Sequence, residues 1–311
     1  MRYGLIGWPL GHSISPQLHR RLAGVEYELR PLPEAEFERF MRERDFSAVN
    51  VTIPYKRQVL PYCAQLTPAA RRCGSVNLLI KGRDGTLTGD NTDLAGLEFL
   101  LRQNGWVLTG QTVVILGSGG TGHTAKAAAE ELGAAEIATV SRTGELNYEN
   151  LAKRFGKRDF YLINTTPVGM YPKENAAPLH YLPHKTEYVF DAIYNPPVTS
   201  TMKLANPRKT KTRDGLFMLV MQAAHAQTIW TGVTFEPQAC ETILRRTYGK
   251  MAVKRLHEKH GKKNLVLCGF MGSGKTTIGR KLARLTGLEF IDADIYLEAK
   301  EGKKISEICA E

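Results

Sequence analysis

The sequence has few cysteines and no long hydrophobic run, and both absences narrow the class of protein. No two of its cysteines have the CxxC spacing of a metal or redox site, and we interpret them as reduced thiols of a cytoplasmic protein. No apolar stretch approaches the roughly 20 residues that span a bilayer, and the N-terminus lacks the apolar core of a secretory signal. We therefore expect no membrane partner. The five cysteines are Cys63, Cys73, Cys240, Cys268 and Cys309.

Acidic residues are outnumbered, with 31 Asp and Glu against 42 Lys and Arg, which gives a net charge of +11. Such a charge suits either a nucleic acid or an anionic small molecule. The most basic stretches, 203–213 and 250–263, contain no interleaved aromatic residues for base stacking, and the chain has no zinc-finger or RNP motif. We therefore expect solvated basic loops and no nucleic-acid partner.

Short apolar runs alternate with amphipathic segments, which predicts an α/β fold with largely parallel sheets. A length of 311 residues predicts two domains with an appendage. A second α/β unit begins at Gln111, and a third begins at Asn264 after a basic linker. The expected segments are an α/β domain at 1–93, a second α/β domain at 94–215, C-terminal helices at 216–248, the linker at 249–263 and an incomplete α/β fragment at 264–311.

A glycine-rich loop follows the first strand of the second unit. The sequence GSGGTG (117–122) comes after the apolar run VVIL and opens a helical segment, which is the context of a dinucleotide-binding loop. Gly117 permits the tight turn, Gly119 and Gly120 let the backbone approach a pyrophosphate, and Gly122 lets the helix pack on the strand. The positive end of the helix dipole faces the phosphates. We expect a dinucleotide cofactor held in a Rossmann fold.

The next strand ends in Ser141, Arg142 and Thr143, where the residue that reads the ribose is expected. An acidic side chain at this point would accept from the 2′-hydroxyl of NAD, but the first carboxylate is Glu145. Arg142 is a planar cation that suits a 2′-phosphate. The cofactor is therefore expected to be NADP(H).

Polar clusters recur in the first domain at strand ends and helix starts, where the ligand crevice of an α/β sheet lies. Hydroxyl, amide, ammonium and carboxylate groups together suit a small polyhydroxylated acid. For His12 we expect a structural hydrogen bond rather than catalysis. The clusters are GHSISP (11–16), NVTIPYK (50–56), SVN (75–77) and GDNTD (89–93).

These motifs closely resemble the shikimate dehydrogenase family over residues 1 to about 248. The family reduces 3-dehydroshikimate to shikimate with NADPH, in the shikimate pathway of chorismate and aromatic amino acid biosynthesis. The resemblance makes 1–93 the substrate-binding catalytic domain and 94–215 the NADP-binding domain, with the helices at 216–248 packing back toward the former. It is carried, in order, by GWPLGHSISPQLH, NVTIPYK, VN, GDNTD, GSGGTG, SRT, NTTPVGM, DAIYNPPVT and DGLFMLVMQAAHAQTIWTG.

The resemblance also implies roles for single residues. Lys56 and Asp93 become the catalytic pair. Chemistry supports this, because hydride delivery to a ketone creates an alkoxide that needs a proton or a cation. The two serines of the HSISP motif hold the substrate carboxylate. The resemblance implies that no metal takes part in the dehydrogenase reaction. The residues expected around the substrate are Ser13, Ser15, Thr52, Asn77, Tyr194 and Gln222.

Three departures from the family concern two loops and one side chain. The segment between Leu18 and Tyr27 is short, and so is the stretch between Thr201 and Asp214. Phe217 stands where the family usually has glycine, so a bulky ring is expected to reshape the nicotinamide pocket.

The last 48 or so residues contain GFMGSGKT (269–276), a complete P-loop motif between an expected strand, NLVLC, and a helix. They resemble the start of shikimate kinase. The resemblance would give Gly274 and Lys275 to phosphate, Thr276 and Asp292 to magnesium, and Asp294 to shikimate. ATP and magnesium would serve only a complete kinase, so we expect no kinase activity from this chain.

Several alternatives remain open at the level of sequence. One is a quinate/shikimate dehydrogenase of broader specificity, and another is a bifunctional dehydrogenase–kinase if the natural product is longer. An ATP-dependent transferase and a basic NADP-sensing or nucleic-acid-binding protein are further alternatives. The expected partners are 3-dehydroshikimate and shikimate, and the expected state is a monomer or a homodimer.

Overall fold

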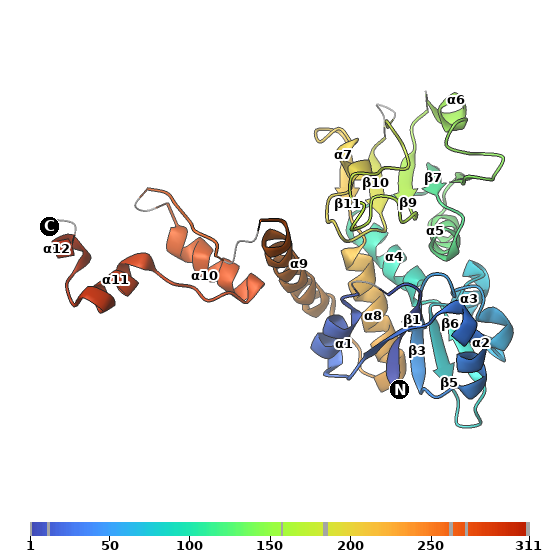
Figure 1. Ribbon diagram of the computed structural model, residues 1–311. Coiled ribbons are helices and arrows are strands. Elements are labelled where there is room, and N and C mark those ends of the chain that lie inside the picture. Colours follow the sequence, from blue (N-terminus) through green and yellow to red (C-terminus); the bar gives the residue numbers. More distant parts are fainter. Residues whose placement is uncertain are drawn as a thin grey trace. The chain divides into compact units, whose positions relative to one another are not determined.

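The computed structural model describes residues 2–10, 13–156, 158–182, 186–260, 264–270 and 273–308, so His12 and Cys309 lie outside the described residues. The chain divides into two compact units, Met1–Cys240 and Glu241–Glu311. Figure 1 shows that the first unit contains two sheets, each flanked by helices. We call these parts the first lobe (residues 2–103) and the second lobe (residues 112–213).

The first lobe is built on a six-stranded sheet of order β2-β1-β3-β5-β6-β4. Strands β1–β2, β1–β3 and β4–β6 are parallel, whereas β5 runs antiparallel to both β3 and β6. The elements are β1 (Tyr3–Gly7), α1 (Ser15–Ala23), β2 (Glu28–Pro31), α2 (Glu34–Glu43), β3 (Ala48–Val51), a 3₁₀ helix (Leu60–Tyr62), β4 (Gln65–Leu66), α3 (Pro68–Cys73), β5 (Leu78–Lys81), β6 (Leu87–Asp90) and α4 (Thr92–Gln103).

The antiparallel pairing of β5 has a local cause. A tight turn joins β5 to β6 at Asp84-Gly85, where Gly85 has φ +82° and donates its N–H to the carbonyl of Gly82 at 3.0 Å. Asp-Gly is a typical hairpin turn, because glycine adopts positive φ without steric cost. The first lobe thus has three parallel and two antiparallel strand pairings, and the antiparallel ones both involve β5.

The second lobe has a five-stranded sheet of order β11-β10-β9-β7-β8 in which every pairing is parallel. This is the Rossmann arrangement that the glycine loop predicted. Strand β11 lies within the stretch 203–213, which the sequence indicated as a solvated loop. The elements are β7 (Thr112–Leu116), α5 (Gly120–Glu131), β8 (Glu136–Val140), α6 (Leu151–Phe155), β9 (Tyr161–Asn164), β10 (Tyr188–Asp191), α7 (Ser200–Lys203) and β11 (Lys211–Arg213).

Helix α8 (Leu216–Thr231) returns from the second lobe to pack along α4 and α1 (Figure 1). The crossing with α4 is close because Gly96 has no side chain: a Cβ there would lie 2.8 Å from the carbonyl oxygen of Met218. The larger Phe217 packs against Phe99 of α4, with ring centroids 5.7 Å apart. The C-terminal helix α8 thus completes the first lobe.

The second unit begins inside helix α9 (Pro237–His260) and continues through α10 (Lys275–Thr286), α11 (Ala293–Glu301) and α12 (Ile305–Ile308). The basic stretch expected as a linker is therefore helical up to His260. The strand predicted over 264–268 does not form, since the described residues 264–270 pair with no neighbouring strand. A strand needs a partner for its backbone groups, and an apolar run alone does not provide one. Across the described residues, every helix is too short or too polar to cross a membrane.

Candidate active site

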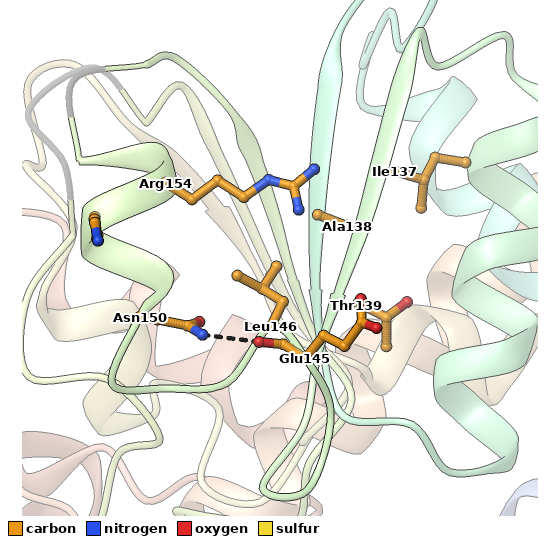
Figure 2. A pocket seen from close by; sticks show the side chains of 8 residues that line it. Ile137, Ala138, Thr139, Glu145, Leu146, Asn150 and Arg154 are labelled. Atoms are coloured by element: carbon orange, nitrogen blue, oxygen red, sulfur yellow. Dashed lines mark hydrogen bonds between the residues drawn. The ribbon is translucent and has the colours of Figure 1, made fainter.

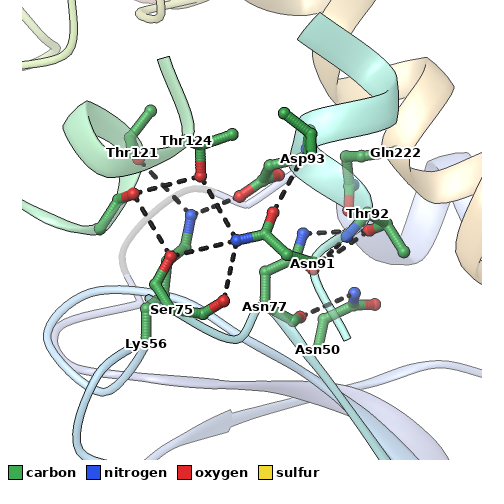
Figure 3. A network of polar contacts seen from close by, with 12 residues as sticks. Asn50, Lys56, Ser75, Asn77, Asn91, Thr92, Asp93, Thr121, Thr124 and Gln222 are labelled. Carbon is green, nitrogen blue, oxygen red and sulfur yellow. Dashed lines mark hydrogen bonds and ion pairs between the residues drawn. The ribbon is translucent and has the colours of Figure 1, made fainter. Parts of the chain in front are cut away.

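The side chains of Lys56 and Asp93 meet at the junction of the two lobes. The Lys56 ammonium donates a hydrogen bond to the carboxylate of Asp93 at 2.6 Å, and the two side chains are only 12% and 11% exposed (Figure 3). The same ammonium lies 3.5 Å from the hydroxyl of Thr121, which belongs to the glycine loop of the second lobe. The structure therefore places both residues of the expected catalytic pair beside the expected cofactor loop.

Asp93 is held in place by the start of helix α4. Asn91 caps this helix, because its side chain accepts a hydrogen bond from the N–H of Leu94 at 3.2 Å. Asp93 itself is in the first helical turn, where a negative charge is favoured by the helix dipole. Its carboxylate is therefore available to Lys56 rather than used as the cap.

Asn77 and Gln222, two of the expected substrate ligands, come together through Thr92. The side chain of Asn77 accepts from the backbone N–H of Thr92 at 2.7 Å and donates to its hydroxyl at 3.0 Å. The Thr92 hydroxyl is also 3.4 Å from the side-chain oxygen of Gln222 on α8. Three separate segments of the chain are thus joined within one buried network (Figure 3).

The expected carboxylate anchors form a second polar group at the start of α1. The hydroxyl of Ser13 lies 3.1 Å from that of Ser15 and accepts from the Ser15 backbone N–H at 3.2 Å. The backbone of Ile14, between these two serines, lies close to the phenol of Tyr194 of the second lobe. Burial raises the pKa of the Tyr194 phenol. Tyr194 is therefore placed beside both serines.

Thr52 is the expected substrate residue with the fewest described side-chain contacts. Its backbone N–H donates to the carbonyl of Ile6 at 2.9 Å, which fixes the segment that follows β3. Its methyl group lies where a Cβ on Gly7 would be, at 2.4 Å. A glycine at position 7 thus lets Thr52 lie against the end of β1, at the same edge of the sheet as Lys56.

The glycine loop has the close approaches that a dinucleotide-binding turn needs. Gly117 has φ +105°, and a Cβ on Gly122 would lie 2.2 Å from the carbonyl oxygen of Gly117. A Cβ on Gly119, at the N-terminus of α5, would meet no atom within 4 Å. The first two positions are therefore needed for the turn itself, and Gly119 leaves free space at the helix N-terminus. These features fit a bound pyrophosphate.

Residues that sequence reasoning did not assign a role connect the two lobes. The side-chain amide of Asn91 donates to the carbonyl and hydroxyl of Ser75 at 3.0 and 3.1 Å and to the hydroxyl of Thr124 at 3.3 Å (Figure 3). Thr124 in turn donates to the carbonyl of Gly120 at 3.2 Å. The signal that would have found Thr121 and Thr124 is their position as polar residues within and just after the GxGxxG motif.

The expected 2′-phosphate residues follow β8. Arg142 and Thr143 are exposed, while Ser141 is half-buried and its N–H donates to the carbonyl of Leu146 at 3.1 Å. A groove of about 740 Å³ lies beside this turn, between residues 137–139 of β8 and the segment 145–154 (Figure 2). The Lys56–Asp93 pair is not among the residues that line it.

The P-loop side chains in the second unit are also close to one another. Lys275 donates to the carbonyls of Gly269 and Phe270 at 2.8 Å each, and the preceding Gly274 has φ +81°. The hydroxyl of Thr276 lies 3.3 Å from Asp292, which also accepts from the N–H of Asp294 at 3.3 Å. Across the described residues of both units, no cluster of three His, Cys, Asp or Glu side chains could hold a metal ion.

Comparison with known proteins identifies the first unit. Residues 5–79 match the model of the shikimate dehydrogenase substrate binding domain. A shikimate dehydrogenase (NADP(+)) of Halothermothrix orenii is 34% identical over 266 residues, which cover 74% of this chain and 90% of that protein. This chain belongs to the shikimate dehydrogenase family. Another shikimate dehydrogenase, from Methanothermobacter thermautotrophicus, is 34% identical over 276 residues and 96% of its length.

Solved structures of the shikimate dehydrogenase family have the same fold. The Thermus thermophilus enzyme in complex with NADP(H) and shikimate superimposes with a TM-score of 0.66, at 32% identity, over 79% of this chain and 99% of that one. A chorismate mutase/shikimate 5-dehydrogenase fusion from Clostridium acetobutylicum gives a TM-score of 0.71 at 31% identity, over 84% and 98% of the two chains. The predicted α/β fold is thereby confirmed.

The C-terminal segment matches a different family model. Residues 271–311 match the model of shikimate kinase. The chain thus joins a shikimate dehydrogenase to a segment similar to shikimate kinase, as its P-loop motif indicated.

Proposed function

We propose that this chain reduces 3-dehydroshikimate to shikimate with NADPH, with Lys56 and Asp93 as the catalytic pair. The observation that carries the proposal is the 2.6 Å contact between these two side chains, directly beside the glycine loop of the second lobe. Membership of the shikimate dehydrogenase family supports the same reaction. The proposed catalytic pair and the proposed cofactor loop therefore lie together at the junction of the lobes.

When bound, NADPH supplies the hydride. Its pyrophosphate would be held by Gly119, Gly120 and the N-terminus of α5, and its 2′-phosphate by Arg142 with Ser141 and Thr143. The chain's own catalytic step is the transfer of a proton from the Lys56 ammonium to the oxygen on which negative charge develops. Asp93 keeps that ammonium in position through its 2.6 Å hydrogen bond. Because both side chains are largely buried, their charges are poorly screened by water and stabilise the developing alkoxide strongly.

The substrate would lie across the polar groups of the first lobe. Ser13 and Ser15, whose hydroxyls are 3.1 Å apart, offer two donors to the carboxylate, and Tyr194 stands next to them. Asn77 and Gln222, linked through Thr92, would bind the ring hydroxyls together with Thr52. In this proposal the carboxylate lies at the start of α1 and the reacting carbon lies near Lys56.

The decisive experiment follows the loss of NADPH absorbance with 3-dehydroshikimate in the wild type and in Lys56→Met. Methionine keeps much of the lysine's length but has no proton to give, so kcat should fall by orders of magnitude while NADPH still quenches protein fluorescence. Asp93→Asn should lower kcat and raise KM, because the ammonium loses its charged partner. Near-normal turnover by Lys56→Met would refute the assignment.

We infer that the enzyme works in the cytoplasm with small-molecule partners. The described cysteines Cys63, Cys73, Cys240 and Cys268 are all free thiols, which are typical of a reducing compartment. Cell fractionation with an antibody against the chain tests this inference.

A further inference from the structure

A buried carboxylate ties both ends of the loop that carries Tyr194. Asp191 ends strand β10 and is fully buried, as is Thr199, which precedes α7. One oxygen of Asp191 accepts from the Thr199 hydroxyl at 2.7 Å, and the other accepts from the N–H of Ile193 at 3.1 Å. The loop of residues 191–199 is thus closed on itself by a single side chain.

The part of this loop that contains Tyr194 lies at the expected substrate site. Tyr194 is half-buried, and its phenol lies close to the backbone of Ile14. Ile14 lies between Ser13 and Ser15, whose hydroxyls are the expected anchors of the substrate carboxylate. The position of the phenol therefore depends on the conformation of the loop that Asp191 closes.

The same loop is also fixed to the helix that carries Gln222. The N–H of Gly215, at the start of α8, donates to the carbonyl of Ile193 at 3.1 Å. Any Cβ on Gly215 would lie 2.0 Å from the carbonyl oxygen of Ala192, so the helix start and the loop are in direct backbone contact. A change in the conformation of the loop would therefore alter the positions of both Tyr194 and the start of α8.

We propose that Asp191 is a positioning residue: its carboxylate closes the loop 191–199 and holds Tyr194 against the backbone between Ser13 and Ser15, where it completes the site for the substrate carboxylate. This proposal rests on the proposed function. An uncharged core would suit stability better than a buried carboxylate, since burial of a charge is costly. Asp191 is used here because two acceptor oxygens on one side chain can hold a hydroxyl and an N–H at the same time.

The test removes the hydroxyl that Asp191 holds. In Thr199→Val the shape is kept and two hydrogen bonds are lost, the one to Asp191 and the one that the hydroxyl accepts from the N–H of Met202 at 3.2 Å. The KM for 3-dehydroshikimate should therefore rise by about three- to tenfold. The kcat and the KM for NADPH should change by less than twofold, and Thr199→Ser should restore the wild-type KM. Thr210→Val is the matched control, because Thr210 is another buried threonine of the same lobe, whose hydroxyl donates to the carbonyl of Thr186 at 2.6 Å.

A double variant and an exchange measurement complete the test. If Thr199 acts through Tyr194, then Thr199→Val should add little to the KM of Tyr194→Phe, whereas independent effects would multiply. Amide exchange at Ile193, measured without substrate, should be faster in Thr199→Val and unchanged in Thr210→Val. Wild-type KM together with unchanged exchange in Thr199→Val, or multiplicative effects in the double variant, would overturn the proposal. A wild type that does not reduce 3-dehydroshikimate, with faster exchange in Thr199→Val, would instead refute the proposed function alone.

Discussion

The methylene chain of Lys56 lies against the backbone of Gly120 in the opposite lobe. A Cβ on Gly120 would be 3.1 Å from both Cβ and Cδ of Lys56, which is tighter than an ordinary van der Waals contact. The absence of a side chain at position 120 thus serves the lysine as well as the cofactor loop. Because of this contact, we expect alanine at position 120 and alanine at the neighbouring position 119 to have different effects.

We expect Gly120→Ala to displace the Lys56 side chain by a few tenths of an ångström and to lower kcat by about tenfold, because small misplacements of a catalytic group are costly. The added methyl of Gly119→Ala would instead enter the free space at the N-terminus of α5 and weaken NADPH binding. Steady-state kinetics and NADPH titrations of both variants measure this contrast. If the two variants change kcat and NADPH affinity alike, Gly120 has no special relation to Lys56.

Arg142→Ala should weaken NADPH binding much more than NADH binding. Loss of a charge-assisted contact to the 2′-phosphate should cost about 1.5–3 kcal/mol, whereas NADH has no such group to lose. Arg208→Ala removes the same charge from an exposed position of the same lobe and is the control for net charge. Equal losses of affinity for both cofactors in Arg142→Ala would contradict the assignment.

His19 should make the fold sensitive to acid. Its ring is 1% exposed and stacks on Tyr27 at 4.0 Å between centroids, and burial lowers its pKa from 6.5 to about 3. Between pH 6.5 and 3 the unfolded chain binds a proton at this ring and the folded chain does not. The contribution of His19 to stability is therefore complete above pH 6.5 and is lost as the pH falls toward 3.

The slope of unfolding free energy against pH should accordingly be smaller in His19→Phe by up to about 1.4 kcal/mol per pH unit between pH 6 and 4. Denaturant unfolding at several pH values measures it. The exposed His225 of α8 provides the control, and His225→Phe should keep the wild-type slope. A wild-type slope in His19→Phe would show that the buried ring is not the group that takes up the proton.

Removal of the residues after His260 should leave the dehydrogenase activity unchanged. Every residue that we place in the dehydrogenase site lies within Met1–Cys240, which is a compact unit by itself. The truncation keeps all of α9 and removes the P-loop segment. We expect kcat/KM for 3-dehydroshikimate within about twofold of the full chain, and a loss greater than tenfold would show that the second unit supports the site.

The sequence predicted the parts of the fold and site that depend on short, regular motifs. The GxGxxG loop lies between a strand and a helix as predicted, and Lys56 and Asp93, 37 residues apart, are in contact. Strand β11 was missed because it is short and basic, and parallel pairing with β10 alone makes it a strand. The prediction for the apolar run at 264–268 failed in the opposite way. Its pattern is typical of a strand, but no strand among the described residues pairs with it.

Contacts between side chains that are distant in the sequence were beyond prediction from single motifs. Asn91 bridges Ser75 and Thr124 because α3, α4 and α5 pack together, and no local pattern encodes that packing. Phe217 differs from the family's usual glycine, and only the position of Phe99 on α4 shows where its ring is accommodated.

The return of α8 to the first lobe also sets an order for folding during synthesis. His19, near the start of the chain, has its side-chain partner at Gln227, 208 residues later, at a distance of 2.7 Å. The first lobe ends at residue 103, so a ribosome that adds about 5–20 residues per second holds it without its last helix for about 6 to 25 seconds. During that interval the face of α1 that α8 will cover is open to water. The nascent first lobe should therefore be a client for chaperones until the second lobe and α8 have been made.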